Sequence, residues 1–105
     1  MTYGQLMGTI QYGSSAEVIV VPDALLAHLK LVMITRMRRS ESFTLSWEQR
    51  VAGAPRHSTV WVHYSMPLRF TFDGAEAPEL DPALLDALMV SSYTAAGIVL
   101  PNDAD

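Results

Sequence analysis

The hydrophobic pattern of the chain is clearest over residues 22–39, where it repeats at helical spacing. One broad apolar stripe is formed by Leu25, Leu26, Leu29, Val32, Met33 and Met37. Ala27, Leu31 and Ile34 lie on nearly the opposite side of the same helix. A helix that is apolar on two sides usually has two burial partners. We therefore expect the stripe to pack on a sheet, and the Ala27 side to contact the C-terminal helix or a second subunit.

Alternating apolar and polar residues predict strands on both sides of this helix. Residues 6–12 and 16–21 form a predicted hairpin before it, joined by a turn at 13–15. Residues 42–48, 58–64 and 67–73 form predicted strands after it. Gly53 and Pro55 favour a long loop over residues 49–57. Val60, Val62 and Tyr64 are expected to point into the core.

Capping residues mark the two helix starts. Asp23 is predicted to cap the first helix. Asp81 and Pro82 predict the start of a second helix over residues 80–92, after a linker at 75–79. A short closing strand is expected over residues 94–100. The sequence thus predicts a two-layer α+β domain in the order ββαβββαβ, with two helices on one face of a mostly antiparallel sheet. The expected domain spans residues 7–100, preceded by an extension at 1–6 and followed by a flexible acidic tail at 101–105.

Composition removes several classes of site. The 105 residues include no cysteine, so disulfides, thiolate metal sites and cysteine nucleophiles are excluded, and the reducing cytoplasm is the expected compartment. The N-terminal segment lacks the basic and apolar regions of a secretion signal. No apolar run approaches the roughly 20 residues that a membrane span requires. The sequence predicts no membrane association.

Charge is unevenly distributed along the chain. Residues 30–69 carry all seven basic residues and two acidic ones, whereas residues 70–105 carry seven acidic residues and no basic one. This asymmetry indicates either a polyanion-binding face or opposite charges that neutralise each other across the fold. Arg36, Arg38 and Arg39 lie in the last turns of the first helix, where cations also stabilise the helix dipole.

One predicted sheet face carries an unusual set of residues. Alternation places outward the residues Ser42, Thr44, Ser46, Thr59, Trp61, His63, Arg69 and Thr71. An outward tryptophan beside histidine and arginine on a hydroxyl-rich face is suited to stacking a base or to an oligomer contact. The alternative is that Trp61 is packed at a sheet edge or under a loop.

No motif in the sequence predicts catalysis, a cofactor or a metal ion. There is no glycine-rich phosphate loop, and the single lysine, Lys30, lies inside a predicted helix. His57 and His63 could meet Glu48 across a hairpin, but their spacing matches no metal motif. The sequence contains no nucleophile elbow, and its acidic residues at 76–86 are explained by capping and solubility.

Four segments together resemble a known family. MGTIQYG (7–13), DALLAHLKLVMITRMRRSESFTLSW (23–47), HSTVWVHYSMPLRF (57–70) and LLDALMVSSYTAAGI (84–98) are similar to a family of uncharacterised actinobacterial proteins of roughly one hundred residues. Members of that family often bear the label ATP-dependent DNA ligase. The resemblance implies kinship and no adenylation chemistry, because Lys30 is followed by Leu-Val-Met instead of a KxDG-like motif.

The chain departs from the family pattern at two places. Residues 1–6 precede the usual start, so Met7 is an alternative initiator. Ser40 stands where the family has a glycine at the helix end, which puts a glycine-type helix stop in doubt.

Three functions are compatible with these observations. The first is a non-catalytic, homo-oligomeric binding or assembly module whose interface includes Ala27, Leu31 and Ile34. The second is a nucleic-acid-binding accessory protein, linked to DNA repair or ligation, whose surface combines Trp61, His63, Thr44, Arg36, Arg38, Arg39, Arg56 and Arg69. The third and weakest is a small hydrolase that uses a serine and His63. The sequence identifies no protein partner and no subunit number.

Overall fold

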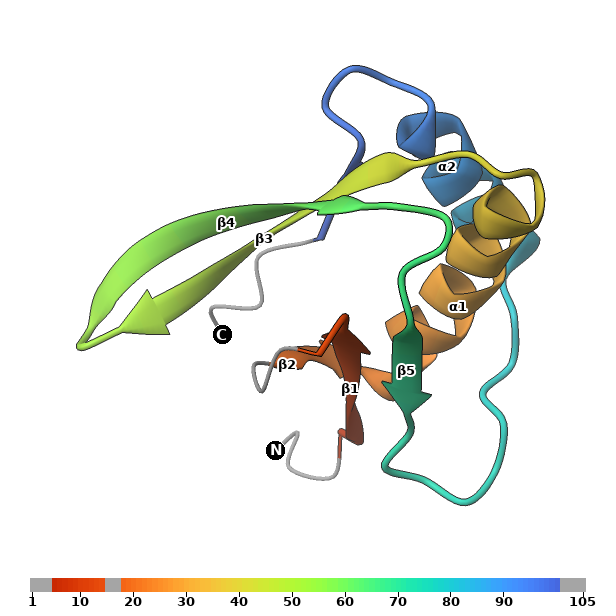
Figure 1. Ribbon diagram of the computed structural model, residues 1–105. Helices are drawn as coiled ribbons and strands as arrows, with labels where there is room; N and C mark the ends of the chain where they lie inside the picture. The colour runs from red at the N-terminus through yellow and green to blue at the C-terminus, as the bar shows by residue number, and fades with distance from the viewer. Residues whose placement is uncertain (1–4, 15–17, 101–105) are drawn as a thin grey trace.

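The computed structural model describes residues 5–14 and 18–100, and the predicted acidic tail at 101–105 lies outside the described residues. The elements follow the order β1 (Met7–Tyr12), β2 (Val18–Pro22), α1 (Asp23–Arg38), β3 (Phe43–Val51), β4 (Ala54–Val62), β5 (Leu68–Thr71), α2 (Pro82–Ser92) and β6 (Ile98–Val99). The predicted α+β class and the predicted order of elements are confirmed. Figure 1 shows α1 and α2 side by side, with the β3–β4 hairpin extending away from the body.

The strands form two three-stranded sheets where the sequence predicted one. The first sheet has the order β2-β1-β5 and the second the order β4-β3-β6. Every pairing is antiparallel except that of β3 with β6. After β4 the chain turns, with Met66 N–H donating to His63 O, and β5 then pairs with β1. Alternation reports which face a strand buries but not which strand lies beside it, so the sequence could not show this division.

The predicted loop at 49–57 is wrong, because these residues continue the two strands of one long hairpin. The β3–β4 register runs from Phe43↔Val62 to Val51↔Ala54. Ala52 and Gly53 both have positive φ, at 54° and 81°, as a two-residue type I′ turn requires. Pro55 fits because its pair with Arg50 is one position beyond the hydrogen-bonded pair that flanks the turn. Its missing N–H therefore faces away from β3.

Asp23 does not cap α1 as predicted, because Pro22 occupies the cap position and Asp23 is the first helical residue. Its carboxylate is buried and instead accepts backbone N–H bonds from Asp73 and Gly74, at 3.1 Å and 2.9 Å. The start of α1 therefore holds the turn that follows β5. This contact joins positions about fifty residues apart, which no local capping rule could reveal.

The C-terminus of α1 ends in a glycine-type stop that is formed by a serine. Ser40 has φ 58°, Ser40 N–H donates to Met37 O, and Glu41 N–H donates to Arg36 O. These are the two hydrogen bonds of a Schellman motif, with Ser40 at the left-handed position. The glycine-type helix stop that the sequence put in doubt is therefore present, and Ser40 adopts the left-handed conformation expected of a glycine.

Replacing Ser40 by glycine is expected to raise the free energy of unfolding by about 0.5–1 kcal/mol. The left-handed conformation costs serine about 1–2 kcal/mol, and the greater freedom of glycine in the unfolded chain offsets up to about 1 kcal/mol of that gain. Urea unfolding followed by circular dichroism measures the difference. Ser40→Ala is the matched control, and equal stability of the glycine and alanine variants would contradict the prediction.

The start of α2 follows the predicted capping. Asp81 accepts a hydrogen bond from Ala83 N–H at 3.0 Å, and Pro82 is the first helical residue. His28, which is buried on α1, joins this cap to the first helix. Its Nε2 accepts from Asp81 N–H at 2.8 Å, and its Nδ1 lies 2.6 Å from Ala24 O. Because Nε2 accepts, Nδ1 carries the proton in this arrangement.

The core is contributed by both sheets and both helices. Its buried apolar residues include Ile10 and Val21 from the first sheet, Leu29 from α1, and Leu45 and Val62 from the second sheet. Tyr64, which was predicted to point inward, follows the end of β4 and is exposed. None of the helices in the described part of the chain has the length and hydrophobicity needed to cross a membrane.

Candidate functional site

A groove runs along the side of α1 that carries Ala27, Leu31 and Ile34. Its volume is about 560 Å³, and its opposite wall is the segment from Phe72 to Leu80 that follows β5. Leu31 is 43% exposed. The second apolar side of α1 therefore forms the floor of an open groove, and α2 does not cover it.

Leu31 forms a ridge between two grooves. Together with Thr35, it also lines a smaller hollow of about 400 Å³, whose other wall includes Leu85 and Met89 of α2. The predicted alternative, that the C-terminal helix covers the Ala27 side, is therefore not what the structure shows. The apolar surface instead continues from the first groove over Leu31 to α2.

Charged side chains lie at the rim of the larger groove. Lys30 Nζ lies 5.9 Å from the centre of the Phe72 ring, and Arg38 lines the groove near the C-terminus of α1. Glu76 also lines the adjoining hollow beside Pro22 and Ala24, which places it at the N-terminal end of α1. The groove thus has a cation at one end and a carboxylate at the other.

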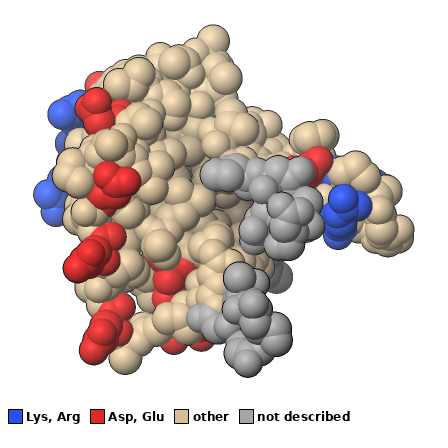
Figure 2. All heavy atoms as spheres, turned by 180° about the vertical axis from the view of Figure 1, so that it is seen from behind, with Lys and Arg blue, Asp and Glu red and all other residues tan. Residues whose placement is uncertain are grey.

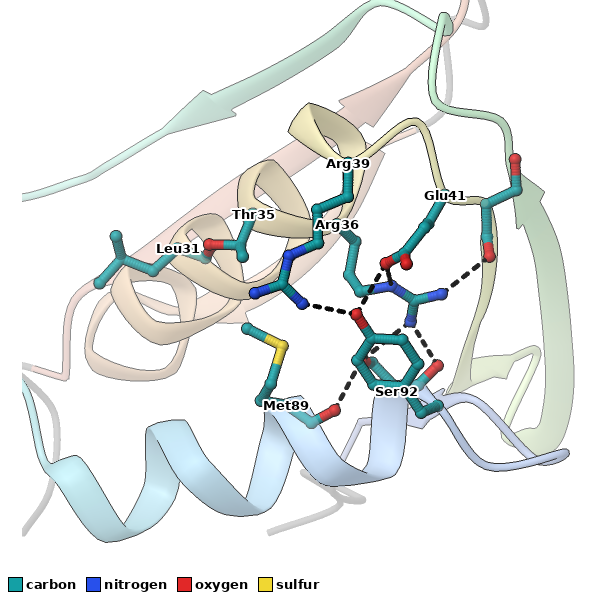
Figure 3. A network of polar contacts seen from close by, with 9 residues as sticks. Leu31, Thr35, Arg36, Arg39, Glu41, Met89 and Ser92 are labelled. Carbon is teal, nitrogen blue, oxygen red and sulfur yellow. Dashed lines mark hydrogen bonds and ion pairs between the residues drawn. The ribbon is translucent and has the colours of Figure 1, made fainter.

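Arg36, predicted as part of a binding surface, is buried and serves to join the two helices. Its guanidinium donates to the Ser92 carbonyl at 2.6 Å, the Ser92 hydroxyl at 3.0 Å, the Ser42 carbonyl at 3.1 Å and the Glu41 carboxylate at 2.7 Å. It also lies 3.8 Å from the centre of the Tyr93 ring. Figure 3 shows these contacts between α1 and the end of α2. A side chain that is only 5% exposed and so occupied cannot contact a ligand on the surface.

Arg39 belongs to the edge of the same network. It donates to the Tyr93 hydroxyl at 2.7 Å, and that hydroxyl donates to Glu41 at 2.7 Å. The Tyr93 hydroxyl, together with the charge of Arg36, holds the pKa of Glu41 below its ordinary value. The side chain of Arg38 is exposed and, among the described residues, makes no hydrogen bond or ion pair, so it is the one of the three helix-end arginine side chains that is available to a partner there.

The outer face of the β3–β4 hairpin corresponds to part of the predicted sheet surface. We define it by alternate positions of the two strands: Thr44, Ser46, Glu48, Arg50, Pro55, His57, Thr59 and Trp61. Trp61 is 61% exposed, as predicted, and it lies opposite Thr44. Ser46 and Thr59 form the next pair, with their hydroxyl oxygens 2.7 Å apart. Val99 of β6 lies beside Ser46 and extends the face.

The structure separates the other predicted surface residues from Trp61. Arg56 pairs with Gln49, so it lies on the opposite face of the hairpin. Arg69 belongs to β5 and therefore to the first sheet. His63 follows β4, where its ring stacks on Tyr64 at 4.4 Å. The expected surface that combines all of them on one sheet face is therefore not formed.

The histidines of the second sheet have local partners. His57 Nε2 lies 3.6 Å from Glu48 Oε2 across the hairpin, and His63 Nδ1 lies 2.7 Å from the Ser65 hydroxyl and accepts from Ser65 N–H. Within residues 5–14 and 18–100, no three residues of the metal-binding types lie close enough together to hold an ion. The arrangement around His63 therefore stabilises the turn that leads to β5.

Sequence analysis did not predict three features of these surfaces. They are Arg50 on the outer face, the wall formed by residues 72–80, and the clamp between Asp23 and the turn at Asp73. Arg50 could have been found by extending the alternation of Thr44, Ser46 and Glu48 by one more step. The predicted loop prevented that step. The wall and the clamp depend on contacts between distant segments and have no local signal.

The separation of charge along the sequence is only partly a separation in space, because Lys30 and Arg38 line the same groove as Glu76. Figure 2 shows acidic side chains gathered over one side of the body with some basic side chains beside them, and further basic side chains at the projecting end of the hairpin. From Gln49 to Phe72 the chain contains three arginines and no acidic residue. The hairpin end therefore does not neutralise the acidic surface within one copy of the chain.

Comparison with known protein families gives a match. The family model described as a domain of unknown function (DUF7882) matches residues 7–103. No curated protein and no solved structure matches the chain.

Proposed function

The chain belongs to the DUF7882 family, and we propose that it is a non-catalytic module that assembles with further copies of itself through the groove on α1. The observation that supports this proposal is the open second apolar side of α1, which was expected from the sequence to need a partner. In the structure, Leu31 and Ile34 line a groove that remains open to solvent. Exposed apolar surface of this kind is typical of protein–protein contacts.

Charge at the two ends of the groove favours an antiparallel pair of α1 helices. Ala27 and Arg38 are eleven positions apart, or about 16 Å along a helix. In a twofold arrangement centred between Leu31 and Ile34, Arg38 of one copy lies opposite Ala27 of the other, about one turn from the N-terminal end of α1. Glu76 lies at that end. Each copy then supplies both the cation and the carboxylate, so the contact is self-complementary.

The resemblance to actinobacterial proteins labelled as DNA ligases adds no catalytic step to this proposal. Lys30 lies on α1 over the Phe72 ring, at the rim of the groove. The absence of cysteine fits a reducing cytoplasm, which we propose as the compartment.

The proposal predicts that Leu31→Asp lowers the mass of the particle. Wild-type protein is expected to sediment above the mass of one 11.6 kDa chain, with a mass that depends on concentration. A buried aspartate at the centre of an interface costs about 2 kcal/mol or more, and a twofold contact contains it twice. Leu31→Asp is therefore expected to sediment as a monomer. Sedimentation equilibrium at several concentrations measures the difference.

Val90→Asp is the matched control for this measurement. Val90 is an apolar helix residue that is 61% exposed on α2, and it does not line either groove. The control is expected to keep the wild-type mass. A monomeric wild-type protein at all concentrations, or equal loss of mass in both variants, would show that the groove is not the contact.

A further inference from the structure

The outer face of the hairpin is not used by the assembly proposed above. It lies on the second sheet, whereas the groove lies between α1 and the segment after β5. Beyond Ser46, β3 pairs only with β4 among the described residues, because β6 reaches only Leu45 and Ser46. Beyond Trp47, whose ring contacts Tyr12 of β1, the hairpin is thus a two-stranded arm that carries an exposed face of its own.

This face combines three kinds of group in a row. Trp61 presents an exposed indole at the end nearest the body. The hydroxyl group of Thr44 lies opposite it, and those of Ser46 and Thr59 form the next pair along the strands. Arg50 lies near the tip, where it donates to Gly53 O at 3.1 Å with one of its five N–H groups. An aromatic plane, hydroxyl groups and a guanidinium match the bases, the sugars and the phosphates of a nucleic acid.

We propose that the outer face of the β3–β4 hairpin binds single-stranded nucleic acid, with a base stacked on Trp61 and a phosphate bound by Arg50. Arg50 pairs with Pro55, six positions from Trp61, which corresponds to about 20 Å along a strand. That length accommodates several nucleotides. A single strand fits better than a duplex, because stacking on Trp61 requires a base whose face is free.

The charges of the hairpin favour a polyanion over a second copy of the same face. Two copies placed face to face with their arms in the same direction would bring Arg50 of each toward the like charge of the other, and an antiparallel pair would place each Arg50 opposite the Trp61 end. The face carries one acidic residue, Glu48, whose side chain is 20% exposed and lies 3.6 Å from His57 Nε2. Glu48 thus lies beside the His57 ring within the face, whereas Arg50 has no acidic partner among the described residues.

Fluorescence anisotropy of labelled oligothymidylate and oligouridylate, each of about 12 nucleotides, tests the proposal. Wild-type protein is titrated into each probe at low and at physiological salt. Trp61→Ala is expected to weaken binding roughly five- to 150-fold, the range that base–aromatic stacking contributes. Arg50→Glu is expected to weaken binding and to reduce the salt dependence by about one phosphate contact.

Arg69→Glu is the matched control, because it changes the net charge of the protein by the same amount on the other sheet. It is expected to retain most of the wild-type affinity. In a Trp47→Phe background, Trp61 is the remaining tryptophan, and its fluorescence is expected to fall as the probe binds. Circular dichroism confirms that each variant is folded.

Three results would overturn the proposal. The first is no binding of either probe at low salt. The second is equal loss of affinity in Arg50→Glu and Arg69→Glu, which would reflect net charge alone. The third is a change of particle mass in Trp61→Ala, which would show that a second copy covers this face. Leu31→Asp is expected to bind the probes with the affinity of a single wild-type arm. The mass of the particle therefore tests the assembly proposal, and the affinity for the probes tests the nucleic-acid proposal independently.

Discussion

Arg36→Met is expected to lower the free energy of unfolding by about 3 kcal/mol. Breaking a buried, hydrogen-bonded charge network typically costs about 3–5 kcal/mol. The lower end applies here because Glu41, whose side chain is 37% exposed, can be rehydrated when its partner is lost. The carbonyls of Ser42 and Ser92 lose the guanidinium N–H groups that they accept, and the Ser92 carbonyl contact is buried.

Urea unfolding followed by circular dichroism and by tryptophan fluorescence measures this loss. Thermal unfolding provides a second measure, since about 3 kcal/mol corresponds to a fall of very roughly 12–24 °C in a domain of this size. Both are performed in the Leu31→Asp background, so that self-association does not contribute to the stability that is measured.

Two variants distinguish the effect of losing the Arg36 hydrogen-bond network from the effect of losing a positive charge. Arg38→Met removes an exposed arginine from the same end of α1 and is expected to change the stability by less than about 0.5 kcal/mol. Arg36→Lys keeps the charge but cannot reproduce the planar fork of donors, so it is expected to remain clearly destabilised. Equal stability of Arg36→Met and Arg38→Met would show that the network contributes nothing.

Gly8→Ala is expected to lower the free energy of unfolding by about 3 kcal/mol. An added Cβ would lie 2.6 Å from Leu26 Cδ2 and 2.8 Å from Asp23 Oδ1, and closer still to the Thr71 carbonyl oxygen. These groups come from α1 and from the backbone of β5, so relief requires that an element moves. Overpacking of a close contact costs about 1–3 kcal/mol, and backbone neighbours place this site at the upper end.

Gly53→Ala is the control for the loss of a glycine as such. Gly53 has φ 81°, and an added Cβ would contact no atom within 4 Å. Gly53→Ala is therefore expected to lower the free energy of unfolding only by the cost of placing alanine in the left-handed conformation, about 1–2 kcal/mol. Urea unfolding compares the two variants. If Gly8→Ala were no less stable than Gly53→Ala, the close approach of α1 and β5 to β1 would not be tight in solution.

Local signals in the sequence identified most of the elements. The helical spacing of Leu26, Leu29, Val32 and Met33 predicted the buried stripe of α1, and all four are buried. Asp81 and Pro82 predicted the start of α2. The alternation around Thr44 and Trp61 predicted which side chains point outward from the second sheet. Each of these predictions depends on residues a few positions apart, where the period of a helix or strand determines direction.

Signals that depended on typical turn residues were less reliable. Gly53 and Pro55 indicated a loop, yet the turn contains only Ala52 and Gly53, and Pro55 lies within β4. Ser40 adopts the left-handed conformation although it is not glycine. In both cases the hydrogen bonds and packing around the turn outweigh a local preference of about 1–2 kcal/mol.

The sequence by itself determined the α+β class, the order of the elements and the second apolar side of α1. Only the tertiary structure decided that the strands divide into two sheets, that Arg36 is buried instead of exposed, and that Asp23 holds a turn about fifty residues away. The physical reason is the separation along the chain of the residues that interact. Periodicity and capping are properties of neighbouring residues, whereas strand pairing and the burial of a charge depend on which distant groups supply hydrogen bonds. Ser42, Ser92 and Tyr93 make burial of the Arg36 guanidinium favourable, and no pattern within α1 could indicate them.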